Sequence, residues 1–153
     1  MKVLSQALCA GIVLASVAGC AQDPNDTLSA NASDTAADGS TLIIASVREW
    51  KVSANRISVS AGPTTFLVSN LGTIKHEFLL TKTDFANGQI PIDSKLNKFS
   101  EEGKGVKVVK EISEWAPLTT QLLTFNLAPG NYQLLCNLPG HYGNGMHTEL
   151  TVK

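Results

Sequence analysis

The fold of this chain is decided close to its end, by Leu135-Cys136-Asn137-Leu138-Pro139-Gly140-His141-Tyr142-Gly143-Asn144-Gly145-Met146. This stretch places a thiol, an imidazole and a thioether at C-x4-H-x4-M spacing. Soft, redox-active copper accepts these three side-chain types together, whereas zinc makes little use of a thioether. The residue types therefore indicate a copper site.

Turn residues in this stretch allow one loop to supply all three ligands. The strand-like run Asn131–Leu135 leads into the cysteine, and Pro139-Gly140 can turn the chain so that His141 faces the same point. A second turn at 143–145 then returns Met146 at the beginning of another strand. A trigonal site of two histidines and one cysteine needs a further imidazole from elsewhere in the fold.

His76 is the candidate for that second imidazole. It lies between two apolar strand-like runs, Thr65–Val68 and Phe78–Leu80. A hydrogen-bonded structural histidine is the alternative interpretation of His76, and His147 is the rival ligand. Because His147 directly follows Met146 in a strand, its side chain is expected to face the opposite way. The swapped assignment, with His147 as ligand and Met146 in the core, stays open.

With these residues, the chain resembles the cupredoxins, the small blue copper electron-transfer proteins, in particular those of the plastocyanin, azurin and rusticyanin type. The resemblance covers roughly residues 41–153 and rests on the ligand loop with its Pro-Gly and on the Asn-x-Gly segment before the first histidine. It implies that one copper ion is held by four ligands, namely His76, Cys136, His141 and an axial Met146.

One position departs from the family pattern. Many cupredoxins have Asn or Ser directly after the first histidine, where it forms a hydrogen bond to the loop that carries the other ligands. Here Glu77 stands at that position. The surroundings of the ligands, and with them the reduction potential, therefore do not follow from the resemblance.

The resemblance also implies a function, the transfer of single electrons between Cu(I) and Cu(II) without an enzymatic reaction. His141 would reach the surface within an apolar patch of Leu138, Pro139 and Tyr142, where redox partner proteins dock through a small interface. A copper-tolerance or copper-delivery protein could use the same ligands, so this alternative stays open. Three histidines in the whole chain are too few for an additional catalytic copper.

Composition agrees with a single globular domain. The chain has 153 residues, of which 43% are hydrophobic and 16% charged. Its formal charge of −1 gives no support to nucleic-acid binding, which usually requires a basic patch. We expect a monomer.

From residue 41 onward the chain consists of short β-rich runs separated by turns. We expect an all-β fold, an antiparallel two-sheet sandwich of about seven or eight strands, and the resemblance adds Greek-key connections. In the irregular segment 83–115 we expect a short helix at Asp93–Phe99 and another strand at Val106–Ile112. Five aromatic side chains are assigned to the core, Trp50, Phe66, Phe78, Trp115 and Phe125. The predicted strands are Leu42–Val47, Arg56–Val59, Thr64–Val68, Phe78–Leu80, Leu122–Leu127, Tyr132–Leu135 and Glu149–Val152.

Residues 1–19 are typical of a targeting segment, because Lys2 precedes an uncharged, largely apolar run to residue 17. The run is too short to span a membrane well. Its ending, Val-Ala-Gly before Cys20, resembles a bacterial lipoprotein signal that is cut before the cysteine, which then carries lipid. The alternative is a secretory signal cut after Ala21.

Residues 20–40 are expected to form a flexible acidic tether, because they contain four aspartates and no basic residue. By resemblance to the sorting rules of bacterial lipoproteins, Ala21 rather than Asp after the cysteine favours the outer membrane, with the domain on the periplasmic side of the bacterial envelope. Cys9 would leave with the signal, so Cys136 would be the one free thiol. An inert buried cysteine is the alternative to a ligand there.

Overall fold

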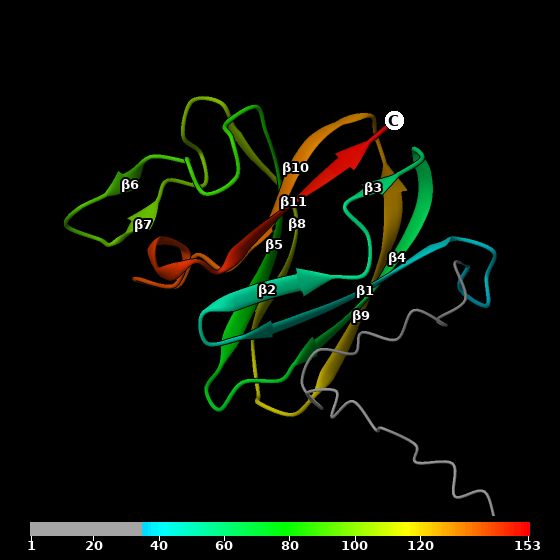
Figure 1. Cartoon of the computed structure of the whole chain (residues 1–153), viewed down its shortest axis with the longest axis horizontal. Helices are drawn as coiled ribbons and strands as arrows, with labels where there is room; N and C mark the ends of the chain where they lie inside the picture. The colour runs from blue at the N-terminus through cyan, green and yellow to red at the C-terminus, as the bar shows by residue number, and fades with distance from the viewer. Residues whose placement is uncertain (1–34) are drawn as a thin grey trace, which may run out of the picture.

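The computed structural model describes residues 35–153, which form two β-sheets packed face to face (Figure 1). The predicted signal at 1–19, the lipid site Cys20 and the first part of the tether lie outside the described residues. Among residues 35–153, no helix has the length and apolar character needed to cross a membrane.

One sheet has four strands in the order β2-β1-β4-β9, and the other has five in the order β3-β11-β10-β5-β8. The first contains β1 (Thr41–Arg48), β2 (Lys51–Ala54), β4 (Gly62–Asn70) and β9 (Thr120–Leu127). The second contains β3 (Ser58–Val59), β5 (His76–Thr83), β8 (Val106–Trp115), β10 (Gly130–Leu135) and β11 (His147–Val152). A separate hairpin joins β6 (Ile92–Asp93) to β7 (Lys98–Phe99), and a 3-10 helix, η1, covers Tyr142–Asn144.

The predicted all-β sandwich is confirmed, although its sheets are mixed rather than purely antiparallel. Two pairs are parallel, β1 with β4 and β3 with β11. The first arises because the chain crosses to the other sheet at β3 before it returns as β4 beside β1. Eleven strands lie within residues 35–153, and three of them, β3, β6 and β7, have only two residues. Such short strands carry too little period-two signal to be found from sequence.

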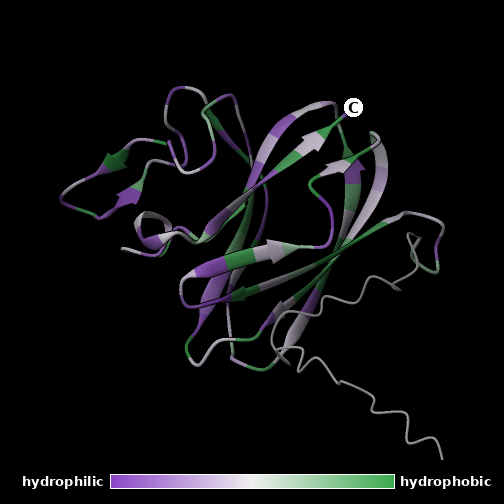
Figure 2. Cartoon of the chain, in the orientation of Figure 1, coloured by the Kyte–Doolittle hydropathy of each residue, from purple (hydrophilic) through white to green (hydrophobic). Residues whose placement is uncertain are grey.

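The core lies between the two sheets, because alternate residues of the long strands turn toward it. Phe66 of β4 is completely buried, and its ring centroid lies 6.0 Å from those of Phe78 and Phe125. Hydrophobic residues run along β1, as Figure 2 shows, and every second residue from Ile43 to Val47 has no exposed surface. The other inward residues include Val68, Leu80, Tyr132, Leu134, Leu150 and Val152.

The five-stranded sheet is also buried on part of its outer face. Leu79 of β5 and Leu135 of β10 point away from the sandwich core and pack with Ile90, Phe99 and Tyr142 in a second hydrophobic cluster. The segment between β5 and β8 supplies this cover, and its hairpin lies beside the loop that carries η1 (Figure 1). The cover explains why β5 is buried at six of its eight residues rather than at every second one.

The helix expected at Asp93–Phe99 is wrong, because this segment is the β6–β7 hairpin. The Asp93 carboxylate accepts hydrogen bonds from the backbone N–H groups of Lys95 and Leu96, and Asn97 has a positive φ of 53°. Aspartate and asparagine stabilise turns in this way. The strand expected at Val106–Ile112 is present as β8 and extends to Trp115.

The described structure begins before residue 41. Residues 36–39 form a turn, in which the backbone N–H of Gly39 donates to the carbonyl of Ala36. Ser40 is buried, and its hydroxyl lies 2.7 Å from that of Thr65 on β4. The packed domain therefore extends several residues into the segment expected to be a tether.

Removal of the Phe66 ring tests the core. We expect Phe66→Ala to lower the free energy of unfolding by about 3–5 kcal/mol, because the cavity would lie between two other aromatic rings. Urea denaturation of the metal-free full chain measures this loss. Leu122→Ala is the control, because Leu122 is 65% exposed on β9 and its loss should change stability by less than about 0.5 kcal/mol. Equal effects of the two substitutions would contradict the assigned core.

Candidate metal centre

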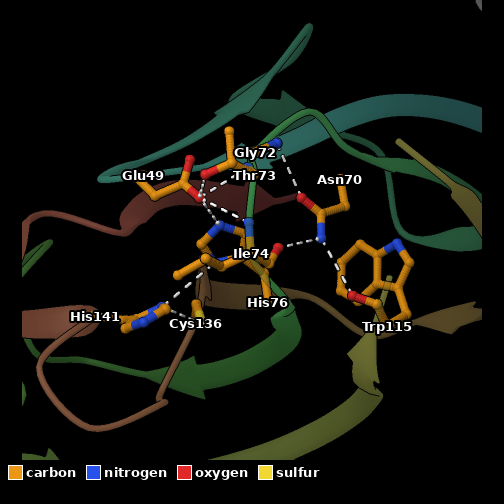
Figure 3. A network of polar contacts seen from close by, with 9 residues as sticks. All are labelled: Glu49, Asn70, Gly72, Thr73, Ile74, His76, Trp115, Cys136 and His141. Carbon is orange, nitrogen blue, oxygen red and sulfur yellow. Dashed lines mark hydrogen bonds and ion pairs between the residues drawn. The ribbon is translucent and has the colours of Figure 1, made fainter. Parts of the chain in front are cut away.

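Three ligand atoms converge at one end of the sandwich (Figure 3). His76, Cys136 and His141 each offer one nitrogen or sulfur atom, and these atoms all lie within 4.8 Å of one another. His141 Nδ1 lies 3.3 Å from His76 Nδ1 and 3.4 Å from Cys136 Sγ. His76 and Cys136 are completely buried, and His141 is 8% exposed. The sequence thus predicted correctly which three residues meet.

Strand pairing brings the first histidine to the cysteine. His76 is the first residue of β5, and Cys136 directly follows β10. These strands are antiparallel neighbours with Leu79 opposite Leu135. The start of one strand therefore lies beside the end of the other.

The loop from Cys136 to Met146 is closed by its own backbone. The N–H of Cys136 donates to the carbonyl of Met146 at 3.0 Å, and the N–H of Met146 donates to the carbonyl of His141 at 3.2 Å. Gly140 and Gly145 have φ values of 84° and 105°, which side-chain-bearing residues rarely adopt. The two predicted turns are therefore real, and each depends on a glycine.

Met146 and His147 face different surroundings. The Met146 side chain is completely buried in the same hydrophobic cluster as Cys136. His147 points to the other side, where its Nδ1 lies 2.9 Å from the Asn87 side-chain oxygen and its ring lies against Tyr142. His147 is not among the residues that converge at the centre. This arrangement agrees with the expected opposite directions of the two side chains.

Burial keeps the converging groups uncharged in the absence of a metal. It raises the pKa of the Cys136 thiol to about 11. Burial also lowers the pKa of His141, and burial together with the nearby His141 lowers the pKa of His76. Neutral imidazoles have a lone pair free for a metal, whereas the thiol must release its proton when a metal binds.

Glu77 takes the place that the family pattern gives to Asn or Ser. Its carboxylate accepts a 2.6 Å hydrogen bond from the backbone N–H of Asn137, the residue after the cysteine. Burial raises the pKa of this carboxyl, and the nearby Glu101 and Glu111 act in the same direction. Glu77 therefore still connects the strand that carries His76 to the loop that carries Cys136, as Asn or Ser does in the family pattern.

Two buried asparagines hold the surroundings of the ligands. The Asn70 amide donates to the carbonyls of Ile74 and Trp115 and accepts from the N–H of Gly72, which fixes the loop before the first histidine (Figure 3). The Asn137 side chain both donates to and accepts from the backbone of Phe99 in β7. Asn137 was not identified from the sequence, because its partner lies in a segment whose fold was misassigned.

Two further residues next to the ligands were also not identified. Trp50, assigned to the core, is 48% exposed, and its ring packs edge-on against His141 with centroids 5.2 Å apart. The Glu49 carboxylate lies 3.6 Å from His76 Nε2. Both residues lie directly after β1, and the local sequence gives no signal that this point reaches the ligands.

The expected exposed patch needs one correction. Tyr142 is only 2% exposed, because its ring packs against Phe99. Its hydroxyl donates a hydrogen bond to the Gln133 side chain and accepts one from the N–H of Ile90. Tyr142 therefore belongs to the second hydrophobic cluster and not to a surface around His141.

The donor set fits copper. Two imidazole nitrogens and one thiol sulfur converge in a buried position, and a thioether side chain is buried in the same cluster as the cysteine. Soft sulfur ligands combined with imidazole favour copper over the hard cations that prefer oxygen.

Comparisons with known proteins agree with this donor set. A family model for copper binding proteins of the plastocyanin/azurin family matches residues 45–153. No curated protein matches the chain.

Solved structures share the fold at low sequence identity. An auracyanin from the photosynthetic bacterium Roseiflexus castenholzii has a TM-score of 0.53 and 22% identity, over 74% of this chain and 98% of that one. Auracyanin A, a blue copper protein from Chloroflexus aurantiacus, has a TM-score of 0.52 and 19% identity, over 75% of this chain and all of that one. Reduced rusticyanin has a TM-score of 0.53 and 17% identity, over 74% of this chain and 77% of that one.

The hydrogen bond of Glu77 can be tested by two substitutions. We expect Glu77→Ala to lower the free energy of unfolding by about 2 kcal/mol, because the backbone N–H of Asn137 would lose its acceptor. Glu77→Gln retains an oxygen at this position and should cost much less. Urea denaturation of the metal-free full chain compares the two. An equal loss in both variants would show that the negative charge, and not the acceptor, is what matters.

Proposed function

Since the chain belongs to the plastocyanin/azurin family of copper-binding proteins, we propose that it carries single electrons between redox partners. We assign His76, Cys136, His141 and Met146 as the residues that hold the copper. The observation that supports this assignment is the convergence of two imidazole Nδ1 atoms and one cysteine Sγ within 4.8 Å in a buried position.

Each proposed ligand has a distinct part. The two imidazoles supply neutral nitrogen donors, and Cys136 supplies a sulfur donor once its proton is lost. Met146 would supply a soft thioether sulfur from the same loop. Bound copper would contribute a one-electron Cu(I)/Cu(II) couple, and we expect no catalytic reaction in addition.

The protein around the ligands is built to keep them in place. Asn70 fixes the loop before His76, Glu77 links that strand to the residue after Cys136, and backbone hydrogen bonds close the ligand loop. Ligands that move little between oxidation states make electron transfer fast, because little rearrangement accompanies it. Rigid surroundings therefore favour an electron carrier.

His141 is the route to the surface in this proposal. It is the one proposed ligand with any exposed surface, and Trp50 packs against its ring. Pro139 is exposed and Leu138 is half-buried in the same loop. We propose that redox partners dock over this surface, formed by Trp50, Leu138, Pro139 and His141, through a small and transient interface.

The location of the protein is proposed from the sequence alone. Residues 1–19 would direct export, and lipid on Cys20 would anchor the chain to the bacterial envelope, with the domain on the periplasmic side. Ala21 favours the outer membrane. Residues 20–34 would then connect the anchor to the domain, which we expect to be monomeric.

The ligand assignment predicts a specific spectrum. We expect the full chain with one equivalent of Cu(II) to show an intense thiolate-to-copper charge-transfer band, which Cys136→Ser should abolish because a serine hydroxyl cannot replace the thiolate. Visible absorption and paramagnetic resonance spectra measure this. His147→Gln is the matched control and should retain the band, because His147 points away from the centre. Loss of the band in His147→Gln, with its retention in Met146→Leu, would favour the swapped assignment.

The choice between electron carrier and copper carrier predicts a second result. We expect rapid electron self-exchange, measured by line broadening in NMR spectra of mixed oxidised and reduced protein, together with slow loss of Cu(I) to a competing chelator. Rapid exchange follows from tightly held ligands that rearrange little on electron transfer, and slow release follows from the burial of the ligands. Slow self-exchange with ready transfer of Cu(I) to the chelator would instead identify a copper-delivery protein.

A further inference from the structure

The outer nitrogen of His76 faces a carboxylate. His76 Nε2 is buried and has no hydrogen-bond partner within residues 35–153, and the Glu49 carboxylate oxygen lies 3.6 Å from it (Figure 3). This separation is longer than a hydrogen bond, so the contact is electrostatic at this distance. The Glu49 side chain is 25% exposed, and its charge is therefore only partly screened by water.

The position of the carboxylate is fixed by the loop before His76. The same Glu49 oxygen accepts hydrogen bonds from the backbone N–H of Thr73 at 2.9 Å, from that of Ile74 at 3.0 Å and from the Thr73 hydroxyl at 3.2 Å. Three donors on one oxygen stabilise its ionised form. The carboxylate is thus held against the imidazole by groups that are independent of the metal.

Gly72 provides the space for this contact. A Cβ atom at Gly72 would lie 2.8 Å from one Glu49 oxygen, 2.9 Å from the other and 2.8 Å from His76 Nε2. Side chains do not normally approach so closely, so any other residue at position 72 would push the groups apart. The glycine at position 72 therefore leaves room for the Glu49 carboxylate to reach His76.

The orientation of the His76 ring determines which of its nitrogens faces the Glu49 carboxylate. His76 Nδ1 faces His141 and the converging ligand atoms, so the lone pair offered to a metal is on Nδ1. The proton of the neutral ring must then be on Nε2, where it faces Glu49. A carboxylate beyond a metal-bound histidine fixes the tautomer and makes the ring a stronger donor.

We propose that Glu49 is a positioning residue that acts through His76 to stabilise Cu(II) relative to Cu(I) and so lowers the reduction potential of the centre. This inference rests on the proposed copper ligands. A negative charge next to a ligand favours the oxidation state with the greater positive charge. Mutation of a residue that contacts a metal ligand typically changes the metal affinity by about 10–100-fold.

The test compares three full-length proteins loaded with copper, namely the wild type, Glu49→Gln and Glu114→Gln. Gln retains oxygen and nitrogen in place of the carboxylate but removes the charge. Glu114 is the matched control, because it is an exposed carboxylate whose charge also acts on His141 and Cys136. Redox titration gives each reduction potential, and competition with chelators gives the Cu(II) and Cu(I) affinities separately.

We expect Glu49→Gln to raise the ratio of Cu(I) to Cu(II) about tenfold at a fixed solution potential, a rise of about 59 mV in reduction potential. Its Cu(II) affinity should fall by about the same factor and its Cu(I) affinity should change little. The charge-transfer band should remain, because all four ligands are unchanged. A shift in Glu49→Gln no larger than that in Glu114→Gln would overturn the inference.

Gly72→Ala is a second, independent variant, and it decides the matter if Glu49→Gln fails to fold or to bind Cu(II). It retains the negative charge but displaces the carboxylate, which is the end of a flexible side chain and moves more readily than the buried ring. We expect its potential to rise in the same direction, and an unchanged potential would overturn the inference. Absence of the charge-transfer band in the wild type would instead refute the proposed copper site itself.

Discussion

The antiparallel pairing of β5 with β10 is the constraint on which the metal centre depends. Its register sets Leu79 opposite Leu135, so the first histidine and the cysteine meet just beyond the last paired residues. Glu77 and Asn137, sixty residues apart in the chain, complete the contact with a hydrogen bond. A shift of one residue in this register would turn the side chains of β5 to the opposite face and separate the ligands.

The five-stranded sheet can hold this register because both of its faces are packed. Its inner face contributes Phe78, Leu80 and Leu134 to the core, and its outer face contributes Leu79 and Leu135 to the second cluster. The segment between β5 and β8 that covers the outer face also bonds to the ligand loop, where the N–H of Gly140 donates to the carbonyl of Asn97. The fold therefore supports the ligand loop from the core and from outside.

The sequence predicted what local patterns encode and missed what only tertiary contacts create. The three converging residues and the long strands were predictable, because the ligand types, their spacing and the period-two alternation are local. The hairpin at 92–99 was mistaken for a helix, because its turn depends on the Asp93 side chain and on a left-handed Asn97. The positions of Glu49 and Trp50 follow from the parallel pairing of β1 with β4, which alternation does not reveal.

The course of β1 determines which end of the molecule is free to meet other proteins. This strand begins at Thr41 and ends next to Glu49, which contacts His76, so it runs the length of the sandwich toward the ligands. Eight extended residues span about 26 Å. The chain thus enters the domain at the end opposite the ligand loop. Any attachment made through the residues before Thr35 would hold the molecule by its far end and leave His141 and Trp50 pointing away from the point of attachment.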